Sequence, residues 1–122
     1  MHEIYFYEDE AGNSPVYEYI EGLSQRTDKH SRINHNKIND YLQVLHEHGK
    51  TVGEPYIKHI DGNIWELRPL KQRIFFASWI DNSFILLHHF HKKTQKTPSR
   101  EVDKAKRNLK DIQKRQERAD NQ

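Results

Sequence analysis

Two apolar runs separated by a short polar turn constrain the fold of this chain more than any other feature. Residues 73–80 (RIFFASWI) and 84–90 (FILLHHF) are rich in aromatic and branched residues, and Asp81-Asn82-Ser83 lies between them as a turn signal. Runs with so little polar interruption are typical of central strands packed against helices. The pattern therefore predicts an antiparallel hairpin in the middle of a sheet.

Capping and turn signals on either side of this hairpin predict the remaining elements. Capping residues or proline followed by apolar residues at helical spacing predict helices near residues 15–24, 28–48 and 98–115. A short strand is expected at residues 4–6, and consecutive antiparallel strands begin at Ile64, Arg73 and Phe84. Residues 56–60 are expected to form either a short strand or an irregular edge.

The order of these elements predicts an α+β fold. An N-terminal strand and a helical hairpin pack on a small twisted, mainly antiparallel sheet, and a basic C-terminal helix follows. The helices are expected on one face of the sheet, with the other face free for binding. The 122 residues suffice for one domain over residues 1–122. About residues 115–122 are expected to fray, because Ala119 is the only apolar residue after Gln113.

Charge is distributed unevenly along the chain. Residues 1–22 hold six acids and no lysine or arginine, whereas residues 91–122 hold eleven basic residues against five acids. This asymmetry indicates a polyanionic partner, although charged surface helices also arise simply for solubility. The chain has no cysteine and no apolar run long enough to span a membrane. We therefore expect a cytoplasmic protein with no membrane partner.

Imidazoles and ammonium groups follow directly on the second apolar run. The cluster comprises His88, His89, His91, Lys92, Lys93 and Lys96. Alternation along a strand places His89, His91 and Lys93 on one side, and His88 is expected to be solvated at the strand end. Proton carriers beside phosphate-binding charge suit a site that grips a phosphodiester and moves protons around it. Without a third and fourth ligand the pair of histidines predicts neither a metal site nor a cofactor.

The segment Trp65-Glu66-Leu67-Arg68 adds charge to a neighbouring strand. Alternation places Glu66 and Arg68 on the face opposite Trp65 and Leu67, and we expect them to point outward. Arg73 opens the next strand, where its guanidinium can donate to two phosphate oxygens at once. The alternative is an ordinary surface salt bridge of Glu66 with Arg68 and Lys71.

Three segments together resemble the RelE/ParE toxin superfamily, closest to its HigB-like, phage-derived killer-protein branch. They are GNIWELRPL (62–70), RIFFASW (73–79) and LLHHFHKKTQKTPSREVDKAKR (86–107). Proteins of that branch are antiparallel-sheet proteins that enter the ribosomal A site and cut mRNA, and an antitoxin neutralises them. By position, Arg68 and Arg73 match basic residues that embrace the scissile phosphate. Lys93 matches the basic residue after the third strand.

The resemblance implies the toxin of a type II toxin–antitoxin system, acting as a ribosome-dependent mRNA endoribonuclease. Such a reaction needs a proton acceptor for the 2′-hydroxyl, cations around the phosphate and a proton donor for the 5′-oxygen, with no metal. The expected catalytic residues are Arg68, Arg73, His91, Lys93 and Glu66. The expected RNA- and ribosome-binding residues are Lys71, His89, Lys92, Lys96, Arg100, Lys104 and Arg107.

The implied partners are the ribosome, mRNA and a helix-turn-helix, HigA-like antitoxin in a hetero-oligomer. Two other functions stay open. The same fold can poison a topoisomerase without cutting RNA, or serve as a non-catalytic RNA-binding or phage-derived accessory protein. The clustered histidine side chains favour the endoribonuclease over these two alternatives.

Overall fold

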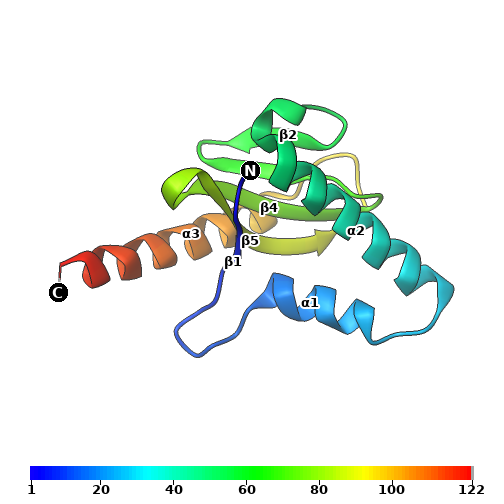
Figure 1. Cartoon of the computed structure of the whole chain (residues 1–122), viewed down its shortest axis with the longest axis horizontal. Helices are drawn as coiled ribbons and strands as arrows, with labels where there is room; N and C mark the ends of the chain where they lie inside the picture. The colour runs from blue at the N-terminus through cyan, green and yellow to red at the C-terminus, as the bar shows by residue number, and fades with distance from the viewer. Residues whose placement is uncertain (122) are drawn as a thin grey trace.

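A mixed five-stranded sheet with helices on both faces forms the fold (Figure 1). The computed structural model describes residues 1–121. In chain order the elements are β1 (Ile4–Phe6), α1 (Pro15–Ser24), α2 (Lys29–His48), β2 (Ile57–Asp61), β3 (Ile64–Leu67), β4 (Gln72–Trp79), β5 (Ser83–His91) and α3 (Ser99–Asp120). The strand order is β1-β5-β4-β3-β2, in which β1 runs parallel to β5 and all other pairs are antiparallel.

The predicted hairpin is confirmed as the centre of the sheet. β4 and β5 pair from Trp79 opposite Ser83 to Gln72 opposite His91. The register shifts once, because Phe75 lies opposite His88 while Phe76 lies opposite Leu86. This bulge leaves one extra residue in β5 and reverses the alternation of its side chains beyond that point. The bulge thereby decides which histidines at the end of β5 face which helices.

The sheet has a separate apolar core on each face. On one face α1 and α2 pack against Ile74 and Phe76 of β4. On the other face Ala105 and Leu109 of α3 pack against Phe75 and its neighbours. The prediction of a free sheet face was therefore wrong, because the narrow apolar stripe of the C-terminal helix covers that face. None of the helices among residues 1–121 is long and apolar enough to cross a bilayer.

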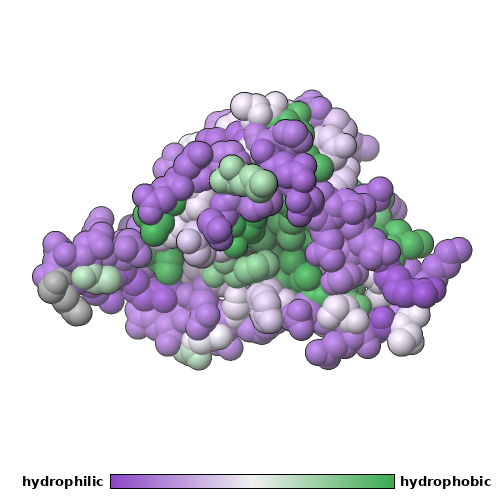
Figure 2. Space-filling view, in the orientation of Figure 1, coloured by the Kyte–Doolittle hydropathy of each residue, from purple (hydrophilic) through white to green (hydrophobic). Residues whose placement is uncertain are grey.

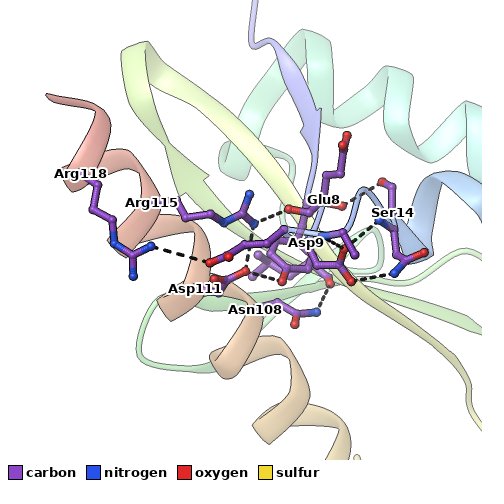
Figure 3. A network of polar contacts seen from close by, with 12 residues as sticks. Glu8, Asp9, Ser14, Asn108, Asp111, Arg115 and Arg118 are labelled. Carbon is purple, nitrogen blue, oxygen red and sulfur yellow. Dashed lines mark hydrogen bonds and ion pairs between the residues drawn. The ribbon is translucent and has the colours of Figure 1, made fainter. Parts of the chain in front are cut away.

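The C-terminal half of α3 is fastened to the segment between β1 and α1 (Figure 3). The Tyr7 hydroxyl donates to Asp111 at 2.7 Å, and Arg115 donates both to Asp111 and to the carbonyl of Glu8. Arg118 lies 3.7 Å from Glu10. α3 continues to Asp120, and its last turns make polar rather than apolar contacts. The expected fraying of about residues 115–122 stays a prediction. Gln122 lies outside the described residues.

Replacing Arg115 tests whether these polar contacts stabilise the end of α3. Arg115→Ala removes the bonds to Glu8 and Asp111 and leaves Tyr7 with a single carboxylate partner. We expect a loss of about 1–2 kcal/mol in the free energy of unfolding, measured by urea denaturation. Lys114→Ala, a change at the exposed neighbouring residue, should change stability by less than about 0.5 kcal/mol. Equal effects of the two substitutions would contradict a structural role for Arg115.

Candidate functional site

A cationic hollow lies at the end of the sheet where β3 ends, β4 begins and β5 ends. Antiparallel pairing brings these three points together, since Leu67 lies opposite Ile74 and Gln72 lies opposite His91. The hollow has a volume of about 690 Å³ and is lined by Arg68, Lys71, Arg73, His91, Lys92, Lys93, Thr94 and Gln95. Five of these eight residues are lysines or arginines, so the hollow suits a polyanionic ligand.

The carboxylate of Glu66 is buried beneath the hollow. Its residue is 1% exposed, and its Oε1 lies 3.4 Å from Nε of Arg68 and 3.7 Å from Nε of Arg73. The prediction that Glu66 points outward was wrong. Glu66 lies opposite Phe75, on the face that α3 covers, so its side chain has no route to solvent. The carboxylate is therefore shielded from solvent and lies between two guanidinium groups.

Hydrogen bonds to the backbone fix the side chain of Arg73 in place. Its Nη1 donates to the carbonyls of Leu70 and Gln72, each at 2.7 Å. Burial lowers the pKa of the Arg73 guanidinium, and the charge of Glu66 opposes this shift. With Nη1 engaged and Nε turned toward Glu66, only Nη2 is left for a ligand. The expected contact of Arg73 with two phosphate oxygens would therefore require Nη1 to exchange one of its bonds to a carbonyl, and it stays a prediction.

Arg68 is the better placed of the two arginines for binding a ligand. Its side chain is 24% exposed, against 11% for Arg73. Its Nε lies 3.4 Å from Oε1 of Glu66 and, among the residues that the structure describes, is buried without a hydrogen-bond partner. The ion pair with the carboxylate keeps the guanidinium fork beside the hollow that Arg68 lines. Bidentate contact with two phosphate oxygens is the geometry such a fork favours.

Lys92, like Arg73, is a lining residue whose pKa is lowered by its surroundings. Burial lowers the pKa of its ammonium group, and the charges of Arg73, Arg68 and Lys58 lower it further against the opposing charge of Glu66. A lysine with a lowered pKa releases its proton more readily and can act as a base. Lys58 was missed in the sequence, because it lies on the weakly patterned strand β2, where it pairs with Glu66 across to β3.

Gln72 connects two histidines at the end of β5. His89 Nε2 lies 2.7 Å from Gln72 Oε1, and Gln72 Nε2 lies 3.1 Å from His91 Nδ1. In this arrangement His89 donates to the amide oxygen and the amide nitrogen donates to His91. Neutral His91 then carries its proton on Nε2, which is the nitrogen not engaged by Gln72. His91 is therefore presented as a hydrogen-bond donor rather than as a base.

His89 occupies an internal position. Its ring stacks on Tyr19 with 3.6 Å between centroids, on the face that carries α1. Burial, together with the nearby His88 and His91, lowers the pKa of His89 to about 4. His89 is thus neutral at physiological pH and packed against α1, which argues against the predicted contact with RNA. The expectation that His88 is solvated also fails, because its Nε2 lies 3.0 Å from Oε1 of the buried Glu101.

The other predicted binding residues lie outside the hollow. Lys96 is exposed in the segment between β5 and α3, and Arg100, Lys104 and Arg107 are exposed on α3. Lys104 lies 3.5 Å from Glu101. The structure therefore separates the predicted cations into a group inside the hollow and a group along α3. Within residues 1–121 no three histidine, aspartate or glutamate side chains converge to hold a metal ion.

The internal position of His89 predicts a dependence of stability on pH. An exposed imidazole binds a proton near pH 6.5, whereas His89 in the fold stays neutral down to about pH 4. Between these values the unfolded chain binds more protons, so the free energy of unfolding falls as the pH falls, by about 2 kcal/mol. Urea denaturation at pH 7.5 and pH 4.5 measures this loss. His89→Gln, which cannot titrate, should show a shallower fall, and an unchanged slope would contradict the assignment.

Comparison with protein families gives one match. The family described as "Phage derived protein Gp49-like (DUF891)" matches residues 24–110, which include α2, the four strands β2 to β5 and the first half of α3. All residues that line the cationic hollow fall within this match. No curated protein matches the chain. The matched region covers more than half of the sequence, and the chain therefore belongs to the phage-derived Gp49-like family, which is associated with RelE-type, toxin-like proteins.

Proposed function

We propose that this protein is the toxin of a type II toxin–antitoxin system, and that it cuts mRNA on the ribosome in the cationic hollow. The observation that carries the proposal is the pair of guanidinium groups that one buried carboxylate, Glu66, holds at the ends of adjacent strands. A site fixed in this way loses little entropy on binding a phosphodiester. The family assignment and the resemblance of its segments to HigB-like toxins support the same function.

The residues of the hollow suffice for cleavage by the 2′-hydroxyl. The 2′-oxygen attacks the adjacent phosphorus, and Lys92 in its neutral form accepts the hydroxyl proton. The terminal nitrogens of Arg68 and Nη2 of Arg73 stabilise the charge that develops on the phosphoryl oxygens. The bond from phosphorus to the 5′-oxygen breaks, and the ammonium group of Lys93 donates a proton to that oxygen. His91 donates a hydrogen bond from Nε2 to the phosphate.

The exposed cations of α3 suit a second task, which is docking on ribosomal RNA. Arg100, Lys104 and Arg107 lie at exposed positions of α3 and do not line the hollow. Ribosomal RNA is a dense phosphate surface, so such contacts give affinity that depends on salt. We propose a helix-turn-helix antitoxin as the partner that neutralises the protein in a hetero-oligomer, as the toxin-like family suggests.

Replacing Arg68 tests the proposed active site with less damage to the fold than replacing Arg73. Arg68→Ala removes the available guanidinium fork, and we expect a fall of about 10²–10³-fold in the cleavage rate, as for loss of one oxyanion donor. Primer extension on a translated message in a reconstituted translation system measures this rate. Arg73→Ala is a poorer test, because it also releases the carbonyls of Leu70 and Gln72.

The control for Arg68 is Lys110→Ala, a change on the exposed side of α3 and outside the hollow. It should leave the rate within about twofold and weaken ribosome binding only slightly, more so at low salt. Undiminished cleavage by Arg68→Ala would contradict the proposed site. Growth arrest with intact transcripts would instead favour poisoning of a topoisomerase or a non-catalytic RNA-binding protein.

The chemical ends of the cut RNA test the proposed reaction independently of any variant. Attack by the 2′-oxygen leaves a 2′,3′-cyclic phosphate, or the 3′-phosphate formed from it, and a free 5′-hydroxyl. The downstream fragment should therefore accept a labelled phosphate from polynucleotide kinase without prior dephosphorylation. A downstream fragment that carries a 5′-phosphate would show attack by water and would overturn the mechanism.

A further inference from the structure

A second, less charged hollow opens directly beside the cationic one. It has a volume of about 330 Å³ and is lined by His30, Ile33, Asn34, Leu70, Lys71 and His91. Two of these residues, Lys71 and His91, also line the cationic hollow. A ligand bound through phosphate in the first hollow can therefore extend into the second. We call this second space the leucine hollow.

Two half-exposed apolar side chains form the wall of the leucine hollow. Leu70 is 47% exposed and Ile33 is 46% exposed, and they come from the β3–β4 loop and from α2. Apolar side chains are visible at the surface beside the N-terminal half of α2 in Figure 2. Exposed apolar residues that sit singly need no explanation, but two that face one hollow beside a charged site indicate a ligand with an apolar face.

Leu70 is held in a strained conformation by its neighbours. Its φ of 57° lies in the left-handed region, which leucine rarely adopts. Three successive carbonyls of its loop accept hydrogen bonds. The carbonyl of Pro69 accepts from the backbone N–H of Gln72, and that of Lys71 accepts from the backbone N–H of Lys92. The carbonyl of Leu70 accepts from Nη1 of Arg73. Arg73 and Lys92 also line the cationic hollow, so residues of that hollow fix the loop that carries Leu70. The fold thus keeps an exposed leucine in place at a cost in stability.

The rim of the leucine hollow is polar and aromatic. His30 and His91 offer flat rings, and Lys71 offers a cation. The side-chain amide of Asn34 is anchored by a 2.9 Å bond to the carbonyl of His30, and the residue is 5% exposed. A flat ligand with apolar faces, polar edges and a covalent link to a phosphate fits these features together. A nucleobase, which its ribose joins to the phosphate, has all of these properties.

We propose that the leucine hollow binds the nucleobase adjacent to the phosphate held in the cationic hollow. The inference rests on the proposed function and deepens it, because it assigns to Leu70 and Ile33 a part in choosing where RNA is cut. Lys71 and His91 line both hollows, so the two hollows adjoin each other. A protein partner that covers the same apolar wall is the competing occupant.

Binding of two non-cleavable probes tests the proposal. One is a 2′-O-methylated trinucleotide, and the other is the same backbone with abasic sugars. The variants are Leu70→Asn and Ile80→Asn, of which the second changes an equally exposed residue, 47% exposed, beyond the opposite end of β4. Asparagine adopts the left-handed conformation readily, so Leu70→Asn should fold with an unchanged or higher melting temperature.

We expect the parent protein to bind the trinucleotide at least about fivefold more tightly than its abasic counterpart. Leu70→Asn should abolish that difference without changing the affinity for the abasic probe, and Ile80→Asn should preserve both affinities. Equal affinity of the parent protein for the two probes would overturn this inference and leave the proposed function standing. Failure of both probes to bind the parent also overturns the inference, because no phosphate is then held beside the leucine hollow. The proposed function fails separately, if a translated message stays uncut. If Leu70→Asn changes antitoxin affinity and leaves both probe affinities intact, the leucine hollow is a protein-docking surface.

Discussion

The burial of one carboxylate, that of Glu66, is the constraint on which the functional end of this protein depends. A charge removed from water in this way must be paired, and Arg68 and Arg73 supply the partners from two adjacent strands. Oε1 of Glu66 lies 3.4 Å from Nε of Arg68 and 3.7 Å from Nε of Arg73, so one carboxylate keeps both guanidinium groups at this end of the sheet. The remaining excess of positive charge faces the cationic hollow, where a polyanion would balance it.

Arg73 connects Glu66 to the loop between β3 and β4. Its two bonds to the carbonyls of Leu70 and Gln72 fix the β3–β4 loop, and the side chain of Gln72 in turn orients His91. The guanidinium of Arg73, the β3–β4 loop and the imidazole of His91 are therefore parts of one connected network. On the face that α3 covers, the pairing of His88 with Glu101 ties the end of β5 to the first turns of α3. Helices on both faces hold the strand ends in register.

Sequence patterns predicted the elements well, because each had a local signal. Ser14-Pro15 before α1, Asp28 before α2 and the turn between β4 and β5 all mark boundaries by chemistry that acts over a few residues. Alternation placed Glu66 correctly on the face opposite Trp65 and Leu67, but it does not tell whether that face meets water. The pattern of α3 showed an apolar stripe but not the sheet face that it would cover.

Features of the site that join distant residues had no sequence signal. Gln72 meets His89 and His91 only through the register of β4 and β5, and the bulge that sets this register is invisible in the pattern. The strained Leu70 depends on bonds from Arg73. The approach of Lys58 to Glu66 likewise depends on pairing between β2 and β3.

Cryo-electron microscopy of the protein on a ribosome with an mRNA 2′-O-methylated at the A-site codon is the most direct test of the central claim. The account predicts a phosphate of that codon within about 3 Å of the terminal nitrogens of Arg68, with Glu66 still buried behind it. Phosphates contacted only by the cations of α3, with the cationic hollow empty, would contradict the account.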